Sequence, residues 1–118
     1  MYGLPKDADL SFLIGEWPTQ ICAGEAQIII RFGDGKRISI QSLVHMYNSE
    51  DMRFEIDEYK TSAGPILELL GKKIISFEIV TPKELVLKFE DQYRLHIFDD
   101  SDQYESFELH DKDTEIYV

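Results

Sequence analysis

Two stretches of the chain repeat the same order of apolar and polar positions. The first, "FLIGEWPTQICAGEAQIIIRFGDGKRISI", covers residues 12–40, and the second, "ELLGKKIISFEIVTPKELVLKFEDQYRLHI", covers residues 68–97. Each opens with an apolar helical turn closed by a glycine and continues as three runs in which apolar and polar residues alternate. Because alternation with a period of two is typical of half-buried strands, each stretch predicts a short helix followed by three antiparallel strands.

The second halves of the two stretches align without a gap. The Asp34–Gly35 pair between alternating runs is a strong hairpin signal, and Asp91 and Gln92 occupy the corresponding turn. We call residues 12–43 repeat unit 1 and residues 66–100 repeat unit 2, with approximate bounds. Common ancestry and the shared constraints of any β-meander both explain the likeness. The aligned pairs are Phe32 with Phe89, Asp34 with Asp91, Arg37 with Arg94 and Ile40 with Ile97.

Further strands are predicted outside the two units. Met52, Phe54 and Ile56 alternate after a loop at residues 48–51, and Pro65 suits the first position of a short helix over "ILELLG". Residues 104–110 and the terminal "TEIYV" supply two more strands. The chain is therefore predicted to be mainly β, with about eight antiparallel strands and two short helices, as a β-sandwich or a partly open barrel. Residues 1–118 form one domain, with C-terminal acidic strands over 101–118.

Composition adds a cellular setting to this fold. With 43% hydrophobic residues over 118 positions, the chain can bury a core without covalent cross-links. Its single cysteine, Cys22, cannot form an internal disulfide. The chain shows no leader-like start and no apolar run near the roughly 18 residues of a membrane span, so we expect a cytoplasmic protein that does not enter a membrane.

The charge is strongly negative and unevenly distributed. The net charge is −11, and residues 95–118 hold eight acids against one lysine. Such a field repels nucleic acid and anionic lipid and attracts cationic proteins. Direct nucleic acid binding is therefore not expected, although an acidic surface that only keeps molecules apart gives the same composition.

Residues that could perform chemistry are sparse. Cys22 has no histidine near it in sequence, and His45, His96 and His110 show no metal-ligand spacing. His96 shares a strand face with Arg94 and is expected to face solvent. The "DDSD" run lacks the glycine and the closing glutamate of a helix–loop–helix calcium loop. We therefore expect no enzyme activity, no cofactor and no bound metal.

The acidic C-terminal strand suggests a docking surface. On a pleated strand, Phe107 and Leu109 point to the core, while Tyr104 and Glu108 point outward together. Next to them we expect an exposed loop with further carboxylates. Tyrosine among carboxylates is a common interface composition, and acids speed the approach of a cationic partner. A solvated edge strand protected from aggregation by its charges is the alternative. The acidic residues of the loop are Asp99, Asp100 and Asp102.

Three motifs resemble a known type of domain. The "FLIG" opening, the "DGKRISIQS" hairpin and the "IFDDSDQYESF" ending are similar to a family of small uncharacterised bacterial domains that begin with "DLSFL-G" and close with "FDDS-QYES". The resemblance spans residues 9–107. Small acidic domains of this type resemble immunity proteins of polymorphic toxin and contact-dependent growth inhibition systems, which neutralise a sister toxin in the cytoplasm.

The leading hypothesis is therefore an immunity protein that blocks a cationic toxin domain, a nuclease being the expected class. The acidic tail would provide the main contact. The alternative is a non-enzymatic interaction or small-ligand-binding module, with a pocket between the repeat units; a homodimer stays open. A third hypothesis is an enzyme with two carboxylates in a desolvated cleft. The predicted partner-binding residues are Asp99, Asp100, Asp102, Tyr104 and Glu108, with a second patch of Glu50, Asp51, Asp57 and Glu58.

Overall fold

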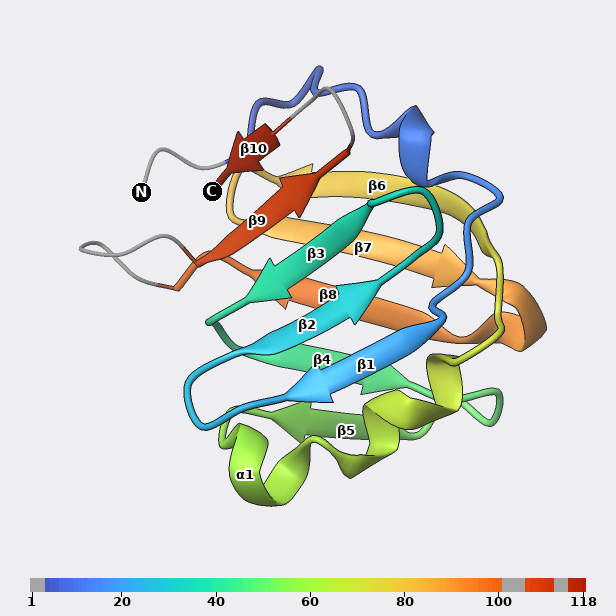
Figure 1. Ribbon diagram of the computed structural model, residues 1–118, viewed down its shortest axis with the longest axis vertical. Coiled ribbons are helices and arrows are strands. Elements are labelled where there is room, and N and C mark those ends of the chain that lie inside the picture. The colour runs from blue at the N-terminus through green and yellow to red at the C-terminus, as the bar shows by residue number, and fades with distance from the viewer. Residues whose placement is uncertain (1–3, 101–105, 112–114) are drawn as a thin grey trace.

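The computed structural model describes residues 4–100, 106–111 and 115–118, in which two antiparallel sheets pack face to face (Figure 1). Both sheets have five strands and stay open, so the fold is a β-sandwich and not a closed barrel. The first sheet has the order β1-β2-β3-β9-β10 and the second the order β5-β4-β8-β7-β6. The strands are β1 (Gln20–Ala23), β2 (Ile28–Arg31), β3 (Arg37–Ile40), β4 (Val44–Tyr47), β5 (Arg53–Ile56), β6 (Ile74–Thr81), β7 (Glu84–Phe89), β8 (Arg94–Phe98), β9 (Phe107–His110) and β10 (Glu115–Tyr117).

Short helical turns lie at the ends of the sandwich. The two that the sequence predicts are η1 (Ser11–Leu13) and η2 (Gly64–Leu69), and Pro65 stands in the first turn of η2. Two more, α1 (Tyr59–Ser62) and η3 (Glu90–Gln92), were not predicted. All four are too short to form a layer of their own, so the sheets carry the architecture.

The core lies between the inner faces of the two sheets. Ile38 and Ile40 from the first sheet and Leu95 and Ile97 from the second are fully buried. Side chains of this size contribute roughly 1.5–3 kcal/mol each when buried, so the alternating positions account for much of the driving force. The predicted inward orientation of Phe107 and Leu109 is confirmed, with exposed fractions of 2% and 0%.

The hairpins that follow the two repeat units are exchanged between the sheets. The hairpin β4–β5 follows unit 1 but pairs with β8 of unit 2, whereas β9–β10 follows unit 2 but pairs with β3 of unit 1. The register of β3 with β9 corresponds to the register of β8 with β4. Ile38 lies opposite Leu109, and its counterpart in unit 2, Leu95, lies opposite Met46. Each half of the chain thus completes the other half's sheet.

This exchange places the acidic C-terminal strand inside a sheet. β9 pairs with β3 on one side and with β10 on the other, so the alternative prediction of a solvated edge strand is wrong for β9. The edge strands of the first sheet are β1 and β10. Figure 1 shows β9 lying beside β3, with β10 at the margin of the sheet.

Candidate functional site

The acidic tail does not form one exposed surface among the described residues. Asp99 was predicted as an exposed loop acid, but it is 5% exposed. Its carboxylate accepts a hydrogen bond from the hydroxyl of Ser106 at 2.7 Å, and its backbone N–H donates to the carbonyl of Lys83. The exposure prediction for Asp99 is therefore wrong, because this carboxylate ties the end of β8 to the start of β9.

The other described members of the predicted patch belong to different elements of the fold. Asp100 is exposed at the end of β8 and accepts a hydrogen bond from the backbone N–H of Leu43 at 3.3 Å. Glu108 is half-buried on the first sheet, where it contacts His110 at 2.9 Å. Asp102 and Tyr104 lie outside the described residues. Asp100 therefore follows a strand of the second sheet, whereas Glu108 lies on a strand of the first sheet.

The second predicted patch is divided between the two ends of β5. Glu50 and Asp51 lie in the β4–β5 turn, whereas Asp57 and Glu58 follow the strand and lead into α1. All four residues are exposed. Asp51 and Asp57 are six positions apart in largely extended chain, which corresponds to about 20 Å at the usual rise per residue. These acids frame the β5 edge of the second sheet at its two corners.

Between those corners, the outer face of the second sheet carries four rings in contact, which we call the ring cluster: His45, Tyr47, His96 and Phe98. His45 lies 4.9 Å from Phe98 and Tyr47 lies 4.9 Å from His96, measured between ring centroids. His45 and His96 are directly opposite each other on β4 and β8. The strand pairing thus assembles the cluster from residues about fifty positions apart.

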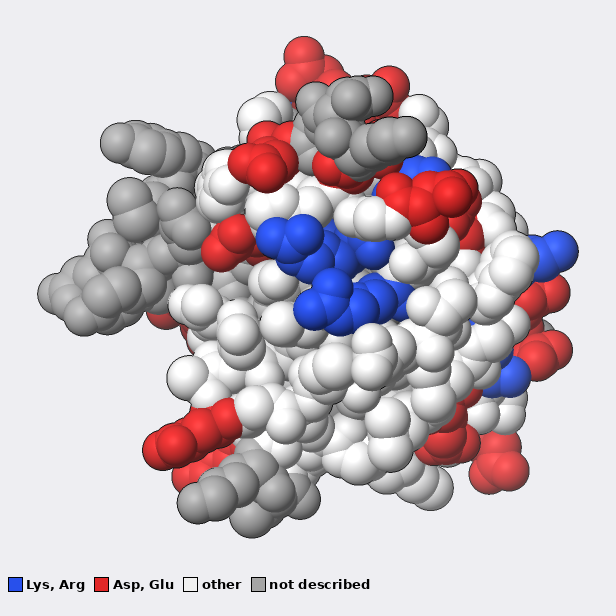
Figure 2. Space-filling model, in the orientation of Figure 1, with Lys and Arg blue, Asp and Glu red and all other residues white. Residues whose placement is uncertain are grey.

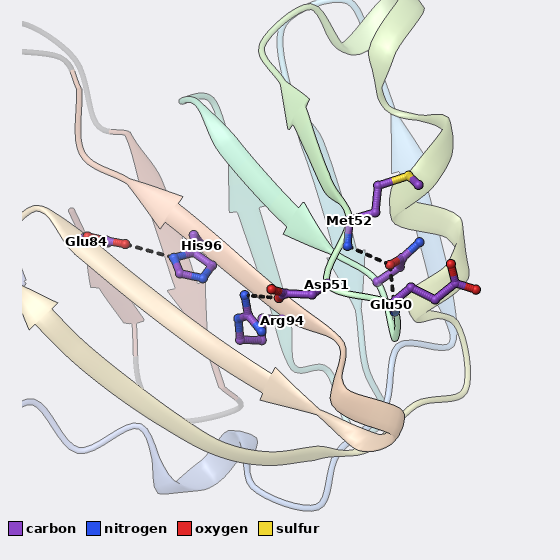
Figure 3. Close-up of polar contacts among 7 residues, drawn as sticks. Glu50, Asp51, Met52, Glu84, Arg94 and His96 are labelled. Carbon is purple, nitrogen blue, oxygen red and sulfur yellow. Dashed lines mark hydrogen bonds and ion pairs between the residues drawn. The ribbon is translucent and has the colours of Figure 1, made fainter.

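Charged side chains hold the ring cluster on two sides. The Arg94 guanidinium lies 4.3 Å from the centroid of the Tyr47 ring. It also donates to Asp51 at 2.8 Å (Figure 3). On the other side, Glu84 of β7 contacts His96 Nδ1 at 2.9 Å. Arg94 therefore links the cluster to the acidic β4–β5 turn, and Glu84 links it to the neighbouring strand.

The cluster is only partly open to water. The side chains of His45, His96 and Arg94 are 17%, 19% and 32% exposed. His96 was predicted to face solvent on the same strand face as Arg94. It does lie on this outer face, but it is only partly exposed, because its Nε2 atom is buried and has no hydrogen-bond partner among the described residues. Burial, and secondarily the positive charge of Arg53, lowers the pKa of His45, so that its neutral form is favoured.

This arrangement suits binding better than group transfer. Aromatic rings and arginine are the residue types enriched in the centres of protein interfaces, and acids at the margin are typical of a polar rim. Among the described residues, no group of three His, Cys, Asp or Glu side chains could hold a metal ion. The cluster presents partly exposed rings and a guanidinium to whatever approaches this face.

The alternation in "LVHMY" and "RLHIF" could have indicated these residues, because His45, Tyr47, Arg94 and His96 all fall on the outward positions of their strands. What the sequence did not give was the pairing of β4 with β8. Without that pairing, the two outward-facing sets of side chains belong to unrelated strands.

A pocket lies at the β1 edge of the sandwich, next to α1 and η2. Its volume is about 340 Å³. Tyr59 lines it and donates its hydroxyl to the carbonyl of Ser42; burial is the main cause that raises the pKa of this phenol. The pocket lies between a strand of unit 1 and the helical turns that precede the strands of unit 2. Its other lining residues are Ile21, Ala23, Ala63, Gly64, Ile66 and Leu67.

A family model described as a family of unknown function (DUF6188) matches residues 18–118. The chain belongs to this family. The DUF6188 match covers all ten strands, including the ring cluster and the exchanged hairpins. No curated protein and no solved structure matches the chain. In the described parts of this DUF6188 domain, no helix has the length and apolar character needed to cross a membrane.

Proposed function

We propose that this domain is a cytoplasmic immunity protein that binds a cationic toxin domain through the outer face of the second sheet and blocks it by occlusion. A nuclease is the expected class of toxin, because its nucleic acid site is necessarily cationic. The main support for this proposal is the ring cluster with Arg94, whose residue types are those enriched in protein interfaces, in a protein of net charge −11. The domain acts by binding and catalyses no reaction.

The ring cluster supplies the affinity in this proposal. Tyr47 and Arg94 are of the residue types in which interface hot spots are enriched, and they already contact each other. The rings are held in place by their neighbours, so little side-chain entropy is lost when a partner covers them. Glu84 contacts Nδ1 of His96 at 2.9 Å, so this ring already has a fixed orientation before a partner arrives.

The acids supply the approach and the orientation. Glu50 and Asp51 at one end of β5, and Asp57 and Glu58 at the other, frame the cluster and are exposed. Exposed acids of this kind raise association rates with cationic proteins and add little to affinity. The predicted second patch thus becomes the rim of the proposed interface, and the tail acids Asp99, Asp100 and Glu108 are assigned no part in its centre.

The test is binding to the product of the gene adjacent to this one, followed by alanine variants. Tyr47→Ala should weaken binding by about 2 kcal/mol, which is roughly 30-fold in Kd. Trp17→Ala is the matched control, because Trp17 is also an exposed aromatic (46%) with a lysine over its ring, yet it precedes β1 and belongs to no strand of the second sheet. Equal Kd values for the two variants would overturn the proposal.

A second measurement separates neutralisation from simple binding. Excess domain should abolish the activity of the captured protein, and Tyr47→Ala should raise the amount of domain needed by a factor similar to its loss of affinity. If the domain binds the partner without reducing its activity, the domain is an interaction module and not an inhibitor.

The pocket beside β1 favours a second candidate function, a small-ligand-binding module. Its volume of about 340 Å³ lies at the lower end of the range for ligand sites, and its lining is mostly apolar. Native mass spectrometry of the purified domain tests this candidate. A bound apolar molecule that is lost in Ala23→Phe, which fills the pocket from an exposed lining position, would support it.

A further inference from the structure

The outer face of the first sheet, on the opposite side of the sandwich from the ring cluster, carries two arginines side by side. Arg31 of β2 and Arg37 of β3 are directly opposite each other in register. Both residues alternate with buried isoleucines, Ile30 and Ile38, so their side chains point outward. Like charges placed directly across a strand pair are destabilising, so this pair carries an energetic cost.

The backbone brings these two side chains into the closest cross-strand arrangement. The carbonyl of Arg31 accepts a hydrogen bond from Thr19 on the β1 side, and the N–H of Phe32 donates to Lys36 on the β3 side. Arg31 and Arg37 therefore form a non-hydrogen-bonded pair, in which opposite Cα atoms are about 4.5 Å apart. The two guanidinium groups start from neighbouring positions and leave the sheet in the same direction.

Acids on the same face are engaged elsewhere. Glu108 contacts His110 Nε2 at 2.9 Å. Glu115 accepts a hydrogen bond from Tyr117 at 2.6 Å and lies 3.6 Å from His110 Nδ1. Arg37 is close enough to Glu115 to contribute to the lowering of its pKa, but the two form no ion pair within 4.0 Å.

The two guanidinium groups are therefore without an ion-pair partner among the described residues, although acids outnumber basic residues 23 to 12 in the chain. By contrast, Lys36, Lys72, Lys88 and Arg94 each have a carboxylate within 4.0 Å. Figure 2 shows Lys and Arg side chains gathered near the middle of this face, over β2 and β3, and Asp and Glu side chains around its margin.

We propose that Arg31 and Arg37 bind the carboxylates of an acidic segment of a second protein. Arginine presents a planar fork of donors that fits a carboxylate with two parallel hydrogen bonds. Gln20 lies next to Arg31 in the same cross-strand row and adds an amide donor. The repulsion between the two arginines is relieved when carboxylates lie over them, so the energetic cost in the free domain becomes binding energy in the complex.

The shape and charge of the surface select this partner. The pair lies on the outer face of a sheet, where an extended segment can lie across the strands, and side chains two residues apart on such a segment point the same way. The net charge of −11 repels a polyanion such as nucleic acid at long range, whereas a short acidic segment makes its contact locally. This surface is independent of the ring cluster, which faces the opposite way.

The probe is a hexaglutamate peptide, followed by amide chemical shifts of the labelled full-length domain at low salt. We expect saturable shifts at Gln20, Arg31 and Arg37. Arg31→Gln and Arg37→Gln should each weaken peptide binding at least tenfold. Arg31→Gln should also raise the thermal midpoint of the free domain, because it removes the like-charge pair. Arg53→Gln is the matched control, an exposed arginine on the second sheet, and should leave the peptide affinity unchanged.

Three outcomes overturn the inference. One is peptide binding that is unchanged in Arg31→Gln and Arg37→Gln, or equally weakened in Arg53→Gln. Another is an equal response to inorganic phosphate at the same concentration, which would make the pair a general oxyanion site. The third is tighter binding of a single-stranded RNA oligonucleotide than of hexaglutamate. A thermal midpoint for Arg31→Gln at or above that of the wild type would show that this variant is folded, so that its loss of peptide binding cannot be due to unfolding.

Discussion

The buried carboxylate of Asp99 gives the sharpest test of how the acidic tail is used. Asp99→Ala removes the acceptor of the Ser106 hydroxyl, and Ser106 is only 1% exposed. The hydroxyl would then be left unsatisfied in a place that water does not reach. The contact joins the end of β8 in one sheet to the residue before β9 in the other, so its loss weakens the connection between the sheets.

The size of the effect follows from the chemistry of the contact. A hydrogen bond to a charged acceptor contributes about 1.5–3 kcal/mol, and a stranded buried donor costs a similar amount. We therefore expect Asp99→Ala to lower the free energy of unfolding by about 2–3 kcal/mol. For a domain of this size, that corresponds to a fall in Tm of roughly 8–12 °C.

Urea denaturation of Asp99→Ala, Asp99→Asn and Asp100→Ala measures this directly. Asp99→Asn keeps an oxygen acceptor and should lose less than half as much stability as the alanine variant. Asp100 is exposed and its hydrogen bond is long, at 3.3 Å, so Asp100→Ala should change stability by no more than about 0.5 kcal/mol. Asp99→Ala and Asp100→Ala with equal midpoints would refute the structural role of Asp99.

Three further predictions concern other parts of the fold. Gln92 has φ 67°, in the left-handed region that favours glycine, and its counterpart in unit 1 is Gly35 with φ 76°. In urea denaturation, Gln92→Gly should therefore raise the free energy of unfolding by about 1 kcal/mol, and Gly35→Gln should lower it by a similar amount. The pKa of Tyr59 is raised, so the folded state favours the neutral phenol, and this contribution to stability is present below about pH 10 and is lost as the pH rises further. In urea denaturation between pH 9 and 11, the stability of Tyr59→Phe should therefore fall less steeply than that of the wild type. The pKa of His45 is lower in the folded state, so the unfolded chain binds a proton at a higher pH than the folded chain, and stability should decrease as the pH falls below about 6.5. In thermal melts between pH 7 and 5, His45→Gln should show a smaller decrease.

Much of the fold could be predicted from local patterns. The alternating runs placed all six strands of the two repeat units, and Asp34–Gly35 adopts the left-handed hairpin backbone that its sequence indicates, with φ 59° and 76°. What local patterns did not give is the exchange of the hairpins. Alternation tells which side of a strand is buried, but β4 finds β8 through contacts between residues far apart in the chain.

The candidate site was predicted less well for the same reason. The outward positions of β4 and β8 were readable, yet their assembly into one cluster depends on the exchange. Asp99 was misjudged although a signal was present: Leu95 and Ile97 point inward on β8, and the same period places Asp99 inward as well. A carboxylate is expected to be exposed on composition alone, but the hydrogen bond from the buried Ser106 hydroxyl makes the inward position of Asp99 tolerable.

The central claim is that a protein partner covers the ring cluster on the second sheet. Amide chemical shifts of the labelled domain, recorded with and without the protein encoded by the adjacent gene, test it most directly. We expect the largest changes along β4 and β8, at His45, Tyr47, Arg94 and His96, with smaller changes at the β4–β5 turn. Changes centred on β9 and β10, with β4 and β8 unaffected, would contradict it.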